Sequence, residues 1–268
     1  MSIIKPLTIL KSAYAKLNLN LTLTGEKTEN GYHTLTSTFV AIDMFAKMKI
    51  DIEDNPNAYV SRTFVNNIEN NKYYNAIVKA VDLWSKRREC PVIVKVQIEN
   101  PLPYEAGLGA SSSYAASVLH ALEEYYIALN LGANPLDSFE MQSIAIKIGA
   151  DVPFFVSGLP YAYVEGIGEI ISPTSPVPKE YLVHLPKYKM STADAYKEAD
   201  TENIVRFIDL RQNKIYYKYL VGITGTELWE LSGSGSTFFI PSPSKELLNM
   251  TETWRKEGID TRLYKAIY

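Results

Sequence analysis

Alternating apolar and polar residues near the N-terminus predict a half-buried β-strand. From Lys16 onward, leucines occupy every second position and share one side of an extended chain, while Asn18, Asn20 and Thr22 point to the other side. Because asparagine is depleted in strands, the polar side indicates contact with a ligand. Lys16 begins this polar side, although a lysine at the end of a strand is more commonly solvated.

A polar turn follows at residues 26–33, where an Asn-Gly pair is typical of a hairpin, and residues 34–42 continue as extended chain. His33 ends the turn. A histidine in such a place usually faces solvent, but its position beside Tyr32 also permits a planar hydrogen-bonding site.

Hydrophobic spacing assigns most of the remaining chain to helices and strands. The expected elements are strands at 48–52, 92–98, 181–185 and 262–268, a strand ending at 240, a hairpin at 162–171, helices at 75–87, 111–129, 138–148, 191–198 and 245–257, and a polar loop at 54–71 around a short segment at 58–64. In the third of these helices, Phe139, Ile144, Ile146 and Ile148 are expected to face the core.

A glycine- and serine-rich stretch at residues 103–116 (PYEAGLGASSSYAA) separates an apolar strand from a long helical segment. Gly107 and Gly109 allow backbone conformations that are closed to other residues and a close approach to a ligand. The free N–H groups and the positive dipole end of the following helix would favour a phosphate at this point. The same residues also fit an ordinary glycine loop in which a serine caps the helix.

Two further stretches carry residues with potential chemistry. In residues 149–155 (GADVPFF), Asp151 either caps a short turn of helix or is a carboxylate that its apolar neighbours tune for proton transfer. Residues 232–237 (SGSGST) form a second glycine–serine turn directly before an apolar strand. The two glycine–serine turns could face one anion.

The composition fits an ordinary globular protein, with 268 residues of which 46% are hydrophobic and 21% charged. This length allows one large domain or two smaller ones. Prolines gather at residues 173–178, which is the best candidate linker and predicts domains at 1–172 and 173–268.

The charge and cysteine content restrict the partners that we expect. A formal net charge of −3 gives no global attraction to nucleic acid or to an anionic membrane. The single cysteine, Cys90, excludes an internal disulfide framework. No apolar run approaches the ~20 residues that span a bilayer, and no signal peptide is evident. We therefore expect a soluble, cytoplasmic protein without nucleic acid or membrane partners. A small-molecule substrate and a monomeric or homodimeric state are further expectations, which the charge and cysteine content do not decide.

These stretches together favour phosphoryl transfer. The P-loop and dinucleotide-binding patterns are absent from the sequence, and so are the histidine and cysteine clusters that ligate zinc. Phosphoryl transfer needs a phosphate cradle, a metal ion, a group that orients or deprotonates the acceptor hydroxyl, and a cation beside the developing charge. The helix-opening loop, Lys16, Asp151 and the second glycine turn offer candidates for these roles.

Four motifs resemble those of the GHMP kinase superfamily. They are the stretch at 103–116, AYAKLNLNL at 13–21 followed by NGYHTL at 30–35, GADVPFF at 149–155 and SGSGST at 232–237. The first motif has four residues between Gly109 and Tyr114, and this spacing is similar to the branch that phosphorylates 4-diphosphocytidyl-2-C-methyl-D-erythritol. The matches span most of the chain.

The resemblance implies an α+β, two-lobed GHMP kinase fold, with a ribosomal protein S5-like N-terminal lobe and a ferredoxin-like C-terminal lobe. It also implies a kinase of the non-mevalonate isoprenoid pathway. Such an enzyme uses ATP and Mg²⁺ to phosphorylate the 2-hydroxyl of the cytidyl-linked methylerythritol.

The resemblance further implies roles for individual residues. Asp151 is expected to be the base for the hydroxyl, with Lys16 pairing with it and holding it ionised, and Ser112 is expected to carry magnesium. His33 is expected to read the cytosine edge. The other substrate-side residues are Asn18, Tyr32 and Thr192, and the pair Phe39 and Tyr196 that stacks on the cytosine. The nucleotide-side residues are Gly107, Leu108, Gly109, Ala110, Ser111, Ser112, Ser113, Gly233, Ser234 and Gly235.

Three positions depart from the family pattern. Glu105 and Ala110 replace usual glycines, and Tyr114 replaces an Asp or Asn. Glu105 brings a negative charge near the expected phosphate cradle. Two alternatives stay open: a GHMP kinase for another small alcohol, against which the turn at 30–33 argues, and a relative that binds nucleotide without transferring phosphate.

Overall fold

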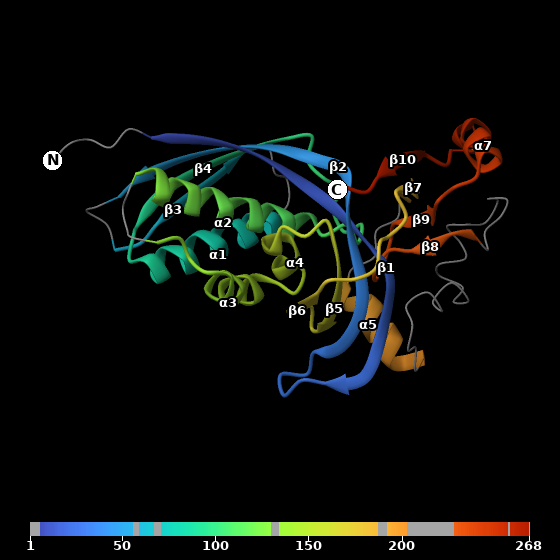
Figure 1. Ribbon diagram of the computed structural model, residues 1–268, viewed down its shortest axis with the longest axis horizontal. Helices are drawn as coiled ribbons and strands as arrows, with labels where there is room; N and C mark the ends of the chain where they lie inside the picture. The colour runs from blue at the N-terminus through green and yellow to red at the C-terminus, as the bar shows by residue number, and fades with distance from the viewer. Residues whose placement is uncertain are drawn as a thin grey trace. The chain divides into compact units, whose positions relative to one another are not determined.

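The computed structural model describes residues 6–55, 59–66, 71–129, 134–186, 192–202, 228–256 and 258–267 (Figure 1). The chain forms two compact units, each built from segments that are distant in sequence. Unit 1 comprises Met1–Tyr14, Phe45–Leu102 and Gly109–Leu159, and unit 2 comprises Ala15–Met44, Pro103–Leu108 and Pro160–Tyr268. The lobe boundary expected between residues 172 and 173 stays a prediction.

Two long strands, β1 (Leu7–Lys27) and β2 (His33–Asp54), pair with each other and contribute residues to both units. The sequence predicts a hairpin here, which is confirmed, but it divides β2 into two strands. The strand continues between the two predicted segments, through residues 43–47. Buried and exposed side chains alternate there, with Met44 and Ala46 buried and Phe45 and Lys47 exposed.

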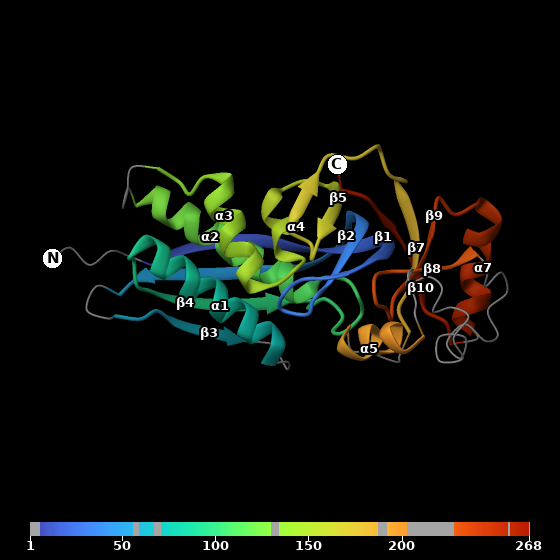
Figure 2. The same ribbon diagram turned by 90° about the horizontal axis from the view of Figure 1, so that it is seen from below.

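Unit 1 is a layer of strands covered on one face by helices. Its added elements are β3 (Arg62–Asn66), α1 (Asn71–Arg88), β4 (Val92–Glu99), α2 (Ala110–Ala128), α3 (Ser138–Ile148) and α4 (Val152–Ser157). β4 runs antiparallel to the second half of β2 and parallel to β3. Figures 1 and 2 show α1 and α2 on one face of these strands, which explains why every second residue of β4 is buried.

The helix α3 has the predicted bounds but not all of the predicted core face. Ile144 is buried as expected, whereas Phe139 is 78% exposed, so that assignment was wrong. Phe139 lies in the first turn, beside a capping box in which the Asp137 carboxylate accepts from the Glu140 N–H and the Glu140 carboxylate accepts from the Asp137 N–H. This reciprocal cap fixes where the helix begins, and Met141 and Ala145 share the buried face with Ile144.

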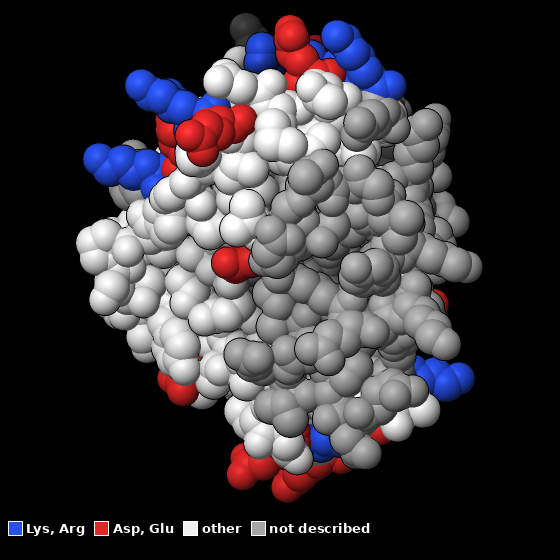
Figure 3. All heavy atoms as spheres, turned by 90° about the vertical axis from the view of Figure 1, so that its right-hand side faces the viewer, with Lys and Arg blue, Asp and Glu red and all other residues white. Residues whose placement is uncertain are grey.

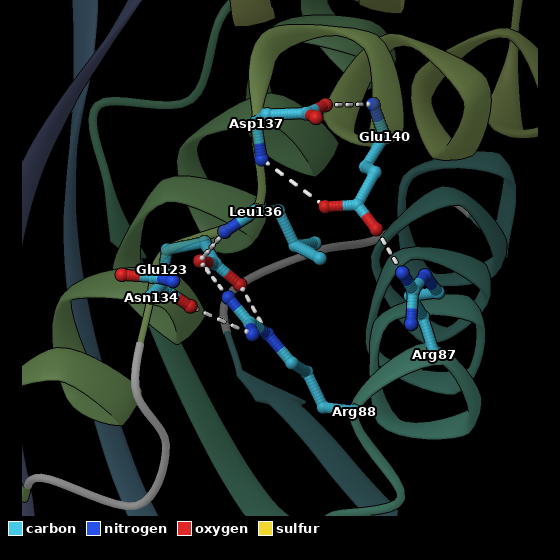
Figure 4. A network of polar contacts seen from close by, with 7 residues as sticks. All are labelled: Arg87, Arg88, Glu123, Asn134, Leu136, Asp137 and Glu140. Atoms are coloured by element: carbon cyan, nitrogen blue, oxygen red, sulfur yellow. Dashed lines mark hydrogen bonds and ion pairs between the residues drawn. The ribbon is translucent and has the colours of Figure 1, made fainter.

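A buried carboxylate, Glu123 on α2, joins three segments of unit 1 (Figure 4). It pairs with Arg88 at the end of α1, with Nη2 2.5 Å from Oε2, and it accepts from the Leu136 N–H before α3 at 2.9 Å. Trp84 Nε1 donates to it at 2.6 Å. Burial opposes ionisation, but these donors hold the pKa of Glu123 below its ordinary value.

Replacing Glu123 with Gln should therefore destabilise the protein by about 3 kcal/mol, since the Arg88 side chain, which is only 11% exposed, loses its carboxylate partner. Urea denaturation measures the change. The pKa of Glu123 is lower in the folded protein than in the unfolded chain. Its contribution to the free energy of unfolding is therefore complete above the ordinary glutamate pKa, and is lost as the pH falls through the lowered folded-state pKa.

The matched control for this substitution is Glu140→Gln. Glu140 pairs with Arg87, whose side chain is 55% exposed, and glutamine still completes the capping box. This substitution should lower the free energy of unfolding by less than about 1 kcal/mol. Equal costs for the two variants would show that burial does not decide the strength of these pairs.

Unit 2 contains a second sheet and the first part of β2. Its added elements are β5 (Tyr161–Gly166), β6 (Ile170–Ser172), β7 (Glu180–His184), α5 (Thr192–Glu202), β8 (Glu230–Leu231), β9 (Phe238–Pro241), α7 (Lys245–Lys256) and β10 (Thr261–Lys265). The order β10-β7-β9-β8 is antiparallel throughout, and β5 pairs with β2 and β6. Trp254 of α7 packs on Trp229, with ring centroids 5.7 Å apart, and His184 of β7 is buried.

The face of the molecule in Figure 3 shows no dominant charge among its described residues. On the face in Figure 3, Lys and Arg side chains lie among Asp and Glu side chains, and neither sign forms a continuous patch among the described residues drawn there. Among the described residues, no helix is both long enough and apolar enough to cross a membrane.

Candidate active site

The two glycine–serine turns pack against each other within unit 2. Gly107 has a φ of 70°, and a Cβ at this position would lie 2.6 Å from the carbonyl oxygen of Ser232 and 2.8 Å from that of Gly235. Only glycine fits so close an approach. The Thr237 N–H donates to the Ala106 carbonyl at 3.2 Å, so backbone hydrogen bonding joins the same two turns.

Lys16 connects the first strand to this pair of turns. Its side chain is buried, its backbone N–H donates to the Leu108 carbonyl at 3.0 Å, and its ammonium donates to the Gly107 carbonyl at 3.1 Å and to Asn18 Oδ1. The ammonium also lies 4.8 Å from the ring centroid of Phe39. The solvated strand-end lysine is therefore the wrong interpretation.

Asn18 is buried as well, so this part of β1 is not half-exposed as the alternation predicts. Its backbone N–H donates to Ser232 Oγ at 3.1 Å, and its side-chain amide donates to Ser37 Oγ at 3.2 Å. A Cβ on Gly233 would lie 3.0 Å from Asn18 Oδ1. The asparagine is thus a hydrogen-bonding link between β1, β2 and the second glycine turn.

The helix α2 begins at Ala110, directly after the first glycine turn. Its N-cap is Gly109, with a φ of 70°, and no side chain caps the helix. The serine cap is therefore wrong as an interpretation. Ser111 and Ser112 are half-buried and Ser113 is buried in the first turn. Helix N–H groups that no side chain caps suit an anion.

Within unit 1, the turn that carries Asp151 lies beside this first turn of α2. A Cβ on Gly149 would lie 3.7 Å from Ser112 Oγ. Asp151 is half-buried at the N-cap position of α4, but its side chain makes no capping hydrogen bond. The predicted capping position is therefore confirmed but without a side-chain cap, while proton transfer stays a prediction. Gln142 of α3 supports the turn by donating to the Pro153 carbonyl at 3.1 Å.

Several residues that are expected to contact the phosphate acceptor lie in the β1–β2 hairpin and in α5, within unit 2. Tyr32 is 64% exposed, and the His33 ring stacks on Tyr196 with centroids 5.5 Å apart and planes at 29°. Thr192 begins α5, but its side chain is outside the described residues. His33 Nε2 lies 3.1 Å from Asp200 Oδ1. Sequence reasoning missed Asp200, although its spacing of four from Tyr196 places both on one helix face.

Two of the departures from the family pattern have local explanations. Glu105 has a φ of 49°, which explains why glycine is usual there, and its carboxylate accepts from the Tyr104 hydroxyl at 2.6 Å. Tyr114 is fully buried, and its hydroxyl accepts from the Leu102 N–H at 2.7 Å. Burial raises the pKa of Tyr114 to about 12, so it is a neutral core residue.

Comparison with known proteins identifies the family. The profile of the GHMP kinase N-terminal domain matches residues 75–159. The 4-diphosphocytidyl-2-C-methyl-D-erythritol kinase of Clostridium tetani (strain Massachusetts / E88) is 32% identical over 201 residues, which cover 75% of this chain and 68% of that protein. The enzyme of the same name from Sulfurovum sp. (strain NBC37-1) is 30% identical over 262 residues, which cover 85% and 97%.

The fold agrees with these relatives. A crystal structure of 4-(cytidine 5'-diphospho)-2C-methyl-D-erythritol kinase superposes with a TM-score of 0.70 at 24% identity, and covers 96% of this chain and 98% of that one. The expected two-lobed α+β GHMP kinase fold is confirmed. The chain belongs to the 4-diphosphocytidyl-2-C-methyl-D-erythritol kinase family of the GHMP kinases.

Proposed function

We propose that this chain is a small-molecule kinase that transfers the γ-phosphoryl group of ATP to the 2-hydroxyl of 4-diphosphocytidyl-2-C-methyl-D-erythritol, in isoprenoid biosynthesis. The family membership supports this reaction. The observation that carries it is the close packing of Gly107 against the Ser232 and Gly235 carbonyls, with the Lys16 ammonium bound to the same turn. The proposed location is the cytoplasm.

The nucleotide phosphates are assigned to the first glycine turn and to the start of α2. Gly107 and Gly109 both have φ of 70°, so their backbone can approach a phosphate where a side chain would intervene. Leu108 and Ala110–Ser113 complete this turn, and Gly233–Gly235 support it in unit 2. Backbone N–H groups and the helix dipole would stabilise the anion.

Mg²⁺ is assigned to the Ser112 hydroxyl together with phosphate oxygens. Magnesium at kinase sites usually needs only one or two protein oxygens, because phosphates and water supply the rest. Ser112 is half-buried in the first turn of α2, beside the turn that carries Asp151. Bound there, the ion would neutralise charge that develops on the phosphates.

The acceptor chemistry is assigned to Asp151 and Lys16. Asp151 takes the proton from the 2-hydroxyl as that oxygen bonds to the γ-phosphorus, and the bond from the γ-phosphorus to the leaving ADP oxygen breaks. Lys16 is assigned to the negative charge that develops in the transition state. Asn18, Tyr32, His33, Phe39, Thr192 and Tyr196 are assigned to the cytidyl-linked acceptor, with His33 at the cytosine edge.

Asp151→Asn should abolish most of the turnover, with a loss of kcat of about 10²-fold or more, because the amide cannot accept the proton. The assay couples ADP release to NADH oxidation, with ATP, Mg²⁺ and the cytidyl-linked acceptor. Asp82→Asn, a half-buried carboxylate on α1, is the control and should retain full activity. Full turnover by Asp151→Asn would remove the assigned base.

The same assay separates the two alternatives. Turnover with homoserine or mevalonate but not with the cytidyl-linked acceptor would assign the chain to another small alcohol. Binding of ATP by calorimetry without ADP formation on any acceptor would make it a non-catalytic relative.

Glu105→Gly should lower the KM for ATP by about two- to fivefold, the range expected when one charge that opposes an anion is removed at a partly exposed site. Glycine also relieves the positive φ, so thermal unfolding should not occur at a lower temperature. Tyr104→Phe is the control, because it removes the donor to Glu105 but leaves the charge. An unchanged KM in Glu105→Gly would place this carboxylate away from the nucleotide.

A further inference from the structure

One carboxylate that belongs to none of the motifs ties the β1–β2 hairpin to α5. Asp200 lies in the last turn of α5, with Oδ1 3.1 Å from His33 Nε2 and Oδ2 3.1 Å from Lys27 Nζ. Tyr196 is one helical turn earlier and stacks on the same imidazole. The ring is therefore held at its edge by Asp200 and on its face by Tyr196.

This contact determines which ring nitrogen carries the proton. An ionised carboxylate only accepts hydrogen bonds, so Nε2 of His33 must donate, and in the neutral ring Nδ1 is then the acceptor. The hydrogen bond from Lys27, followed by that from His33, holds the pKa of Asp200 below its ordinary value. Asp200 therefore stays an acceptor under ordinary conditions.

We propose that Asp200 is a positioning residue that fixes His33 in the tautomer with its proton on Nε2, and thereby favours cytosine over uracil in the acceptor. The inference rests on the proposed function, which assigns His33 to the base edge. Cytosine presents an amino donor where uracil presents a carbonyl acceptor. A ring nitrogen that accepts pairs with the amino group and is repelled by the carbonyl.

The exposure of the three side chains indicates what kind of effect to measure. Lys27 and Asp200 are 46% and 48% exposed, whereas His33 is only 13% exposed. Exposed ion pairs add little to folding stability. The contact should thus be visible in ligand recognition and in the spectrum of His33, and hardly in thermal unfolding.

The kinetic test uses two substitutions of one residue. Asp200→Ala removes the acceptor and should raise the KM for the cytidyl-linked acceptor about fivefold, with kcat and the KM for ATP unchanged. Asp200→Asn keeps an oxygen acceptor without the charge and should restore most of the affinity. The control, Glu29→Ala, removes one exposed carboxylate from the turn between β1 and β2. It should leave kcat and both KM values unchanged.

Base preference is measured with CDP and UDP as competitive inhibitors. Wild-type protein should bind CDP more tightly than UDP. Asp200→Ala should reduce the ratio of the UDP inhibition constant to the CDP inhibition constant, mainly because CDP binds more weakly. An unchanged ratio in Asp200→Ala, or an equal rise in the KM for ATP and for the acceptor, would overturn the inference.

Imidazole ¹⁵N spectra of the ligand-free protein test the tautomer directly. The chain has three histidines, so the His33→Gln variant identifies the His33 signals. These should show a protonated Nε2 and an unprotonated Nδ1 in the wild type and a mixture in Asp200→Ala; identical spectra would reject the positioning role. Failure of the wild type to turn over would instead reject the proposed function, whatever the spectra show.

Discussion

The absence of a side chain at Gly107 is the constraint on which the arrangement of unit 2 depends. Two carbonyl oxygens of the second glycine turn occupy the space that a Cβ would need, so any other residue would force the turns apart. The Gly107 carbonyl is also the acceptor for the Lys16 ammonium and for the Ser232 hydroxyl. This backbone position thus joins a strand to two loops, which lie 91 and more than 200 residues after the strand along the chain.

A buried ammonium is costly unless it is hydrogen-bonded, and this explains the polar residues that surround Lys16. Asn18 and Gly107 supply acceptors, and the Phe39 ring supplies a negative π-face. Asn18 in turn donates to Ser37, so the network extends into β2. Because the members of this network satisfy one another, the ammonium is held in one orientation, which suits the electrostatic role proposed for Lys16.

The local pattern of the sequence predicts most elements, since hydrophobic spacing reports which face of a segment is buried. α3 and the hairpin of β5 and β6 follow this rule. It fails at Phe139, which fits the apolar face of α3 but lies in its first turn and is 78% exposed. Tertiary contacts override the pattern at Lys16 and Asn18. These two residues look like the exposed side of a strand, because nothing local reveals the loops, 91 and 214 residues later, that contact them. The contacts of Tyr114 with Leu102 and of Asp200 with His33 could not be predicted for the same reason, since these partners are not neighbours in the sequence.

The two ends of the candidate site in unit 2 are built with different strength. At the end that is proposed to bind phosphate, Lys16, Asn18 and Ser232 are buried and joined by hydrogen bonds that are largely shielded from water. At the hairpin end, Asp200 and Lys27 are about half exposed, so water and salt can replace their contacts at little cost. A rigid site suits the nucleotide phosphates proposed to bind there, because these groups are the same in every turnover. An exchangeable contact around His33 suits a surface that must admit and release a large acceptor, because it orients the ring without having to break a strong interaction each time.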